Sequence, residues 1–126
     1  MTFVMAEFDK KNGTNFAVDF QEKFPVYTCY ADLKFDKTLI YMWNQEEFIF
    51  TSTPGHSRGS CCIFWKNINA VFTGDSLIKN TPVITRFLGG STKDYNKITA
   101  PYLNALDNDV LVLPGHGDIF YMKEIR

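Results

Sequence analysis

Histidine and cysteine are scarce in this chain, and no stretch of it is strongly basic or long and apolar. The 126 residues include two histidines and three cysteines, and the formal net charge is −1 at pH 7. The scattered Lys and Arg residues form no basic stripe of the kind that a nucleic-acid backbone requires, so we expect no nucleic-acid partner. No apolar run approaches the ~20 residues of a membrane-spanning helix, and the apolar start of the chain ends at Glu7. We therefore expect neither a membrane span nor a signal peptide.

The cysteines, Cys29, Cys61 and Cys62, make a poor disulfide framework. Their number is odd, and two of them are neighbours, which point to opposite faces if they lie on a strand. We expect free, buried thiols in a reducing compartment and therefore predict a cytoplasmic location.

The composition indicates a single globular domain over residues 1–126. Hydrophobic residues make up 45% of the chain and aromatic residues 16%, which is enough for a packed core. One group of aromatic residues is expected to belong to this core rather than to a binding surface. Its members are Tyr27, Tyr30, Tyr41, Trp43, Phe48, Phe50, Phe64 and Trp65.

Short apolar runs separated by turn signals predict several strands. They are expected at residues 38–43, 47–51, 61–66, 70–73 and 110–113 and, in the first third of the chain, at 16–20 and 25–28. Residues 1–46 thus form a divergent set of N-terminal strands, and residues 47–120 form the half that bears the motifs described below.

One helix is predicted between the last two strands. Ser91, with Asp94 three residues later, is typical of a helix start, and apolar residues then recur at helical spacing up to Leu106. Pro101 should kink or restart this helix. The order of strand, hairpin, helix and strand predicts an α/β (α+β) fold in which helices cover at least one face of one sheet.

Three apolar runs end in residues that can bind a metal ion. Two of them lead into Thr53-Pro54-Gly55-His56-Ser57 and Leu113-Pro114-Gly115-His116-Gly117, and the third ends in Phe72-Thr73-Gly74-Asp75. Loops at strand ends often hold ligands, and glycine lets the backbone turn tightly beside a ligand. Imidazole and carboxylate are ligands of zinc, iron and manganese. The pattern predicts a metal site that contains His56, Asp75 and His116.

In this order, the motifs resemble the second half of a metallo-β-lactamase-fold hydrolase, the superfamily that includes the glyoxalase II thioesterases. The resemblance rests on the two histidine loops, on Phe72-Thr73-Gly74-Asp75 and on Gly89-Gly90-Ser91. It implies a partial αββα sandwich with a mixed, mainly antiparallel sheet. It also implies a hydrolase in which a metal-activated water attacks a small-molecule thioester, ester, lactone or phosphoester.

The resemblance assigns a role to each matching residue. His56 would be the third histidine of the first metal position, and His116 a ligand of the second. Asp75 would be the carboxylate that bridges the two positions, at the centre of catalysis. Ser57 and Ser60 would orient the His56 loop, and Asp118 fits no ligand position.

The first-half motif of the family, His-x-His-x-Asp-His, does not occur in this sequence, because its only two histidines lie in the two loops. The matching residues give each of two ions two ligands, or a single ion three. Zinc is the expected cofactor, as one or two ions, with iron or manganese as alternatives and no bound metal as a further one. A homodimer or a separate chain could supply the missing half and cover the sheet face that this half leaves open.

Two functions follow from these expectations. The first is a metal-dependent hydrolase whose ligand set is completed by another chain or copy. The second is a catalytically inactive remnant of the fold that acts as an interaction module.

Overall fold

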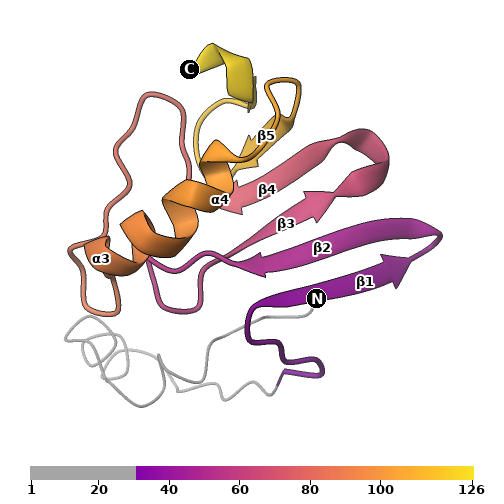
Figure 1. Cartoon of the computed structure of the whole chain (residues 1–126), viewed down its shortest axis with the longest axis horizontal. Helices are drawn as coiled ribbons and strands as arrows, with labels where there is room; N and C mark the ends of the chain where they lie inside the picture. Colours follow the sequence, from indigo (N-terminus) through magenta and orange to yellow (C-terminus); the bar gives the residue numbers. More distant parts are fainter. Residues whose placement is uncertain (1–30) are drawn as a thin grey trace, which may run out of the picture.

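The computed structural model describes residues 31–126, so the strands predicted at 16–20 and 25–28, and Cys29, lie outside the described residues. Six strands of this part form one sheet and lie side by side in the order of the sequence (Figure 1). They are β1 (Thr38–Trp43), β2 (Glu46–Ser52), β3 (Cys61–Trp65), β4 (Ala70–Gly74), β5 (Leu111–Pro114) and β6 (Phe120–Tyr121). The strands predicted in this range are confirmed to within two residues at each end.

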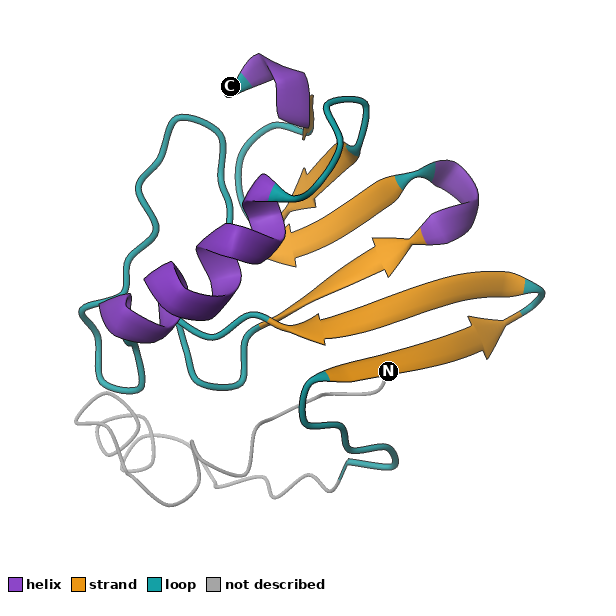
Figure 2. Cartoon of the chain, in the orientation of Figure 1, coloured by secondary structure: helices purple, strands orange, loops and turns teal. Residues whose placement is uncertain are grey.

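The sheet is mixed, and its one parallel pair decides which loops meet. Strands β1 to β4 form an antiparallel meander, β5 pairs parallel to β4, and β6 pairs antiparallel to β5. Asn44 and Gln45 link β1 to β2 with positive φ at both positions, as a tight two-residue hairpin requires. Strands β2, β4 and β5 therefore run in the same direction and end at the same edge of the sheet (Figure 2).

A helix between β4 and β5 covers one face of the sheet (Figure 1). It consists of α3 (Thr92–Asp94), a π-helical turn (Tyr95–Thr99) and α4 (Ala100–Asn104). The Ser91 hydroxyl accepts a hydrogen bond from the Asp94 backbone N–H at 3.1 Å, which confirms the predicted start. Pro101 lies in the first turn of α4, so the predicted restart is also confirmed. The ring of a proline crowds the carbonyl four residues earlier, and the wider π turn just before Pro101 relieves this clash.

The core lies between this helix and the sheet. Cys62, Val71 and Val112 point from the strands toward Leu103 of α4, and all four are buried. Phe120 and the 3-10 helix Met122–Glu124 close one end of this core. The fold therefore has the predicted α/β architecture with a mixed sheet and helix cover. Within residues 31–126, no helix has the length and apolar character needed to cross a membrane.

The aromatic residues predicted to belong to the core are not all buried. Trp43 is 60% exposed and Tyr41 is 41% exposed, so for these two the prediction is wrong. The reason is the strand order, because β1 is an outer strand of the sheet and has a neighbour on one side only. Phe48 contacts Trp43 and Trp65, with ring centroids 6.4 and 5.3 Å away. Tyr27 and Tyr30 lie outside the described residues.

Candidate metal centre

The ends of β2, β4 and β5 bring the three predicted site residues together. Asp75 directly follows β4, and His116 lies two residues beyond the end of β5. The parallel register pairs Gly74 with Pro114, and the Gly115 N–H donates to the Gly74 carbonyl at 2.9 Å. A Cβ at Gly115 would lie 3.3 Å from Asp75 Oδ1, so glycine allows this close approach. His56 comes from the loop after β2, which ends at the same edge of the sheet as β4 and β5.

The two imidazole rings lie on either side of one carboxylate. His116 Nε2 is 2.9 Å from Asp75 Oδ1, and His56 Nε2 is 3.4 Å from Asp75 Oδ2. Asp75 Oδ1 is buried, yet it accepts no hydrogen bond from any residue between 31 and 126, because the short approach of His116 lacks hydrogen-bond geometry. A buried carboxylate oxygen without a hydrogen bond is unfavourable unless a cation is bound to it.

The orientation of His56 is fixed from its other ring nitrogen. His56 Nδ1 lies 2.8 Å from the Ile84 carbonyl oxygen, which can only accept a hydrogen bond. Nδ1 is therefore the donor in this contact, and Nε2 is the ring nitrogen that faces Asp75 Oδ2. A hydrogen bond of this kind from the second nitrogen is typical of metal-ligating histidines.

These atoms fit one half of a two-metal site. One metal position would receive His56 Nε2 and Asp75 Oδ2, and the other would receive His116 Nε2 and Asp75 Oδ1. Among residues 31–126, no group of three or more His, Cys, Asp or Glu side chains is arranged to hold an ion. A complete site thus needs ligands from outside the described part of the chain.

Neither of the two cysteines within residues 31–126 belongs to a group that could hold a metal ion. Cys62 is fully buried in the core, and burial raises the pKa of its thiol to about 11. Burial also raises the pKa of the neighbouring Cys61 thiol. Both are free, as predicted.

A buried polar cluster beneath the site was not predicted from the sequence. The Thr53 hydroxyl donates to Cys62 Sγ at 3.4 Å and lies 3.4 Å from the Ser76 hydroxyl. The Tyr95 hydroxyl donates to the Ser76 carbonyl at 3.2 Å. Because Thr53 precedes the His56 loop and Ser76 follows Asp75, these bonds connect the bases of two ligand loops. The only sequence signal for them is their position next to the two motifs.

The His56 loop is held at both of its ends. Thr53 N–H donates to the Ser60 carbonyl at 2.9 Å, and the Ser57 and Ser60 hydroxyls lie 2.9 Å apart. The two serines therefore shape this loop, whereas Asp118 is exposed. Gly55 belongs to the same loop, and its carbonyl accepts a hydrogen bond from Ser91 N–H at 2.8 Å.

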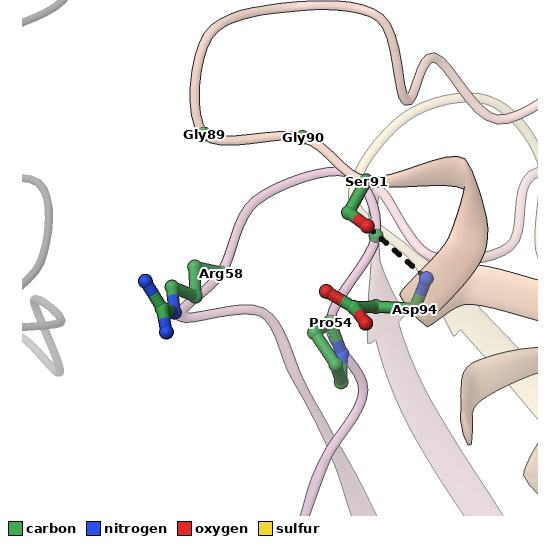
Figure 3. A pocket seen from close by; sticks show the side chains of 7 residues that line it. Pro54, Arg58, Gly89, Gly90, Ser91 and Asp94 are labelled. Carbon is green, nitrogen blue, oxygen red and sulfur yellow. Dashed lines mark hydrogen bonds between the residues drawn. The ribbon is translucent and has the colours of Figure 1, made fainter. Parts of the chain in front are cut away.

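An open hollow of about 350 Å³ adjoins this loop (Figure 3). Its lining includes Gly55 but none of the three site residues, so it is not the metal position itself. The lining residues are Pro54, Gly55, Arg58, Gly89, Gly90, Ser91 and Asp94.

Comparison with known proteins decides the family. The pattern of the metallo-beta-lactamase superfamily matches residues 5–116. The chain belongs to the metallo-β-lactamase superfamily. The family resemblance of the motifs is thereby confirmed.

Individual similar proteins match this chain over part of their own length. An uncharacterised protein of Mycobacterium leprae is 44% identical over 68 residues, which are 52% of this chain and 31% of that protein. The BLEG-1 B3 metallo-beta-lactamase aligns with 90% of this chain and 55% of its own, at 25% identity and a TM-score of 0.68. TTHA1623, solved in a di-iron-bound form, aligns with 60% of this chain and 38% of its own, at 26% identity and a TM-score of 0.56. This chain thus spans about a third of the length of the curated relatives it matches.

Proposed function

We propose that this metallo-β-lactamase superfamily chain carries one half of a metal-dependent hydrolase site. The observation that carries the proposal is the placement of two imidazole nitrogens, 2.9 and 3.4 Å from the two oxygens of the Asp75 carboxylate. The remaining ligands would come from a partner chain, from a second copy or from further sequence. The substrate class is a small ester or thioester.

Each residue would contribute a defined part of the chemistry. A metal ion at such a site supplies Lewis-acid activation of a carbonyl centre and of the attacking water. His56 and His116 would hold the metal as neutral donors, and the Asp75 carboxylate, whose two oxygens face different histidines, would add the negatively charged donor. The Ile84 carbonyl would keep His56 Nε2 free of a proton.

Histidine and carboxylate donors suit zinc, iron and manganese alike. The di-iron form of TTHA1623 makes iron a candidate beside zinc. Elemental analysis should therefore quantify zinc, iron and manganese together, in the untagged chain purified without chelators.

The decisive comparison is the metal content of the wild-type chain and of three variants. We expect metal in stoichiometric amount per chain, reduced at least about tenfold by Asp75→Asn and by His116→Ala. Asp118→Ala is the matched control, because Asp118 is exposed in the same loop as His116 and should retain the metal. Hydrolysis of a p-nitrophenyl ester and of a thioester should follow the metal content.

A folded wild-type chain without metal would contradict the proposal that these residues still bind an ion. Equal metal content in the wild-type chain and in Asp75→Asn would contradict the assigned ligands. Circular dichroism of each variant separates loss of a ligand from loss of the fold.

A second candidate, a non-catalytic interaction module, is supported by the sheet face opposite the helix. Val71 points into the core, so its neighbour Phe72 points to the other face, where it is 38% exposed. Phe72 pairs with Ile63, and Ile63 pairs with Phe50, so an apolar row crosses this face. A chain that binds no metal but self-associates in sedimentation analysis would favour this role.

A further inference from the structure

A closed circuit of hydrogen bonds surrounds His56. His56 Nδ1 donates to the Ile84 carbonyl at 2.8 Å, and the next residue, Thr85, has its hydroxyl 2.6 Å from the hydroxyl of Thr92. Thr92 is the first residue of α3, and the preceding residue, Ser91, donates its N–H to the Gly55 carbonyl at 2.8 Å. Gly55 is bonded to His56, which closes the circuit.

The circuit is needed because Ile84 lies in a segment without regular structure. Residues 82–86 belong to no helix, strand or turn, so no ladder of backbone hydrogen bonds fixes the Ile84 carbonyl. The helix start, in contrast, is fixed by the Ser91 cap on Asp94 (Figure 3). The hydrogen bond between the Thr85 and Thr92 hydroxyls attaches the segment that contains Ile84 to this fixed helix start.

Close packing supports the same arrangement. A Cβ at Gly90 would lie 2.8 Å from the Thr85 carbonyl carbon and 3.0 Å from the Phe87 carbonyl oxygen. The backbone around Thr85 therefore rests directly on the residue before Ser91. This contact and the hydroxyl pair hold the segment at two neighbouring points.

We infer that Thr85 and Thr92 are positioning residues, which act through the Ile84 carbonyl to keep His56 in the tautomer with its proton on Nδ1. Such a tautomer leaves Nε2 able to bind a metal ion. The metal role of His56 rests on the proposed function above. The tautomer itself does not, because two groups of the chain decide it. The Ile84 carbonyl, 2.8 Å from Nδ1, favours a proton there, whereas the Asp75 carboxylate, 3.4 Å from Nε2, favours the other tautomer, and the shorter contact to Ile84 decides.

The test measures the tautomer in the metal-free protein. Long-range ¹H–¹⁵N NMR of the ¹⁵N-labelled chain with EDTA, at about pH 8 where an ordinary imidazole is neutral, distinguishes the two tautomers. The chain has two histidines, so the spectrum should show the ring signals of two imidazoles. The His116→Ala variant removes one set of these signals and thereby assigns both. We expect His56 with its proton on Nδ1 in the wild-type chain.

Removal of either hydroxyl should shift this equilibrium. Thr85→Val and Thr92→Val keep the side-chain volume and break the same bond. Each should lower the ratio of the two tautomers by up to roughly fivefold, because the shift cannot exceed the free energy of the one hydrogen bond that is lost. The double variant should equal either single one. Thr85→Ser keeps the hydroxyl and should restore the wild-type ratio.

The matched control is Thr81→Val, because Thr81 is exposed in the same segment and bonds to the Lys79 carbonyl instead. Thr81→Val should leave the tautomer ratio of His56 unchanged. None of these threonine variants should change the tautomer ratio of His116. A wild-type His56 with its proton on Nε2 would overturn the inference, as would an unchanged ratio in both Thr85→Val and Thr92→Val. A chain with the Nδ1 tautomer but no metal would overturn the proposed function alone.

Discussion

Gly55 should tolerate no side chain, because it lies where the His56 loop touches the helix. Its φ is +148°, and a Cβ there would lie 2.6 Å from Tyr95 Cβ and 2.8 Å from Tyr95 Cδ2. A non-glycine residue in a sparsely populated backbone region costs about 1–3 kcal/mol. Overpacking against a neighbour costs about 1–3 kcal/mol more. Gly55→Ala should therefore lower the free energy of unfolding by about 2–6 kcal/mol.

Gly74→Ala is the matched control for this substitution. Gly74 also has a positive φ, +52°, but a Cβ there would meet nothing within 4 Å. Only the backbone penalty of about 1–2 kcal/mol then applies. Urea unfolding followed by circular dichroism gives both values. Adding Tyr95→Ala to Gly55→Ala should give no rescue, because alanine keeps the Cβ of the shortest contact. A loss in Gly55→Ala no larger than in Gly74→Ala would refute this reasoning.

Two further predictions concern titratable groups away from the site. Burial raises the pKa of the Cys62 thiol to about 11, so about one Cys62 side chain in a thousand is a thiolate at about pH 8. Iodoacetamide should therefore label Cys62 only after unfolding and should label Cys61 sooner. Tandem mass spectrometry distinguishes the two labelled positions. Equal labelling rates in the native chain would contradict this. The second group is Glu124, whose pKa is lowered from its ordinary 4.5 by the Lys79 ammonium, 2.9 Å away, and by the Tyr121 N–H. This carboxylate therefore stabilises the fold above pH 4.5, and its contribution is lost as the pH falls through the lowered pKa. Urea midpoints of the wild-type chain and of Glu124→Gln should differ at neutral pH and converge in acid; a constant difference would exclude the carboxylate as the cause.

Strands β1 to β5 and the convergence of the site loops could be predicted from the sequence, because local patterns mark these strands and the loops at their ends. Short continuous apolar runs mark β2 and β3, and glycine next to His56 and His116 marks the loops at strand ends. Whether these residues bind metal stays a prediction, as do the cytoplasmic location and the division of the chain at residues 46 and 47.

The features that could not be predicted depend on neighbours far away in the sequence. Trp43 has the residue type of a core position, but its exposure follows from the place of β1 at the edge of the sheet, which no local pattern encodes. The acceptor for His56 is the backbone carbonyl of Ile84, and every residue type offers such a carbonyl. The π turn before Pro101 likewise depends on how the whole helix packs.

The parallel pairing of β4 with β5 implies an order in which the site assembles during folding. Strands β1 to β4 are joined by connections of two (44–45), eight (53–60) and four (66–69) residues, so their contacts are local and form quickly. Strand β5 can pair only after the long connection over residues 75–110 has closed, which is the slow kind of contact. We therefore expect His56 and Asp75 to belong to the part of the chain that folds early. His116 would be the last of the three side chains to reach the site. Local opening of β5 would remove this one imidazole while the meander remained folded, so in the proposed site the metal position that includes His116 would be the first to lose its ion.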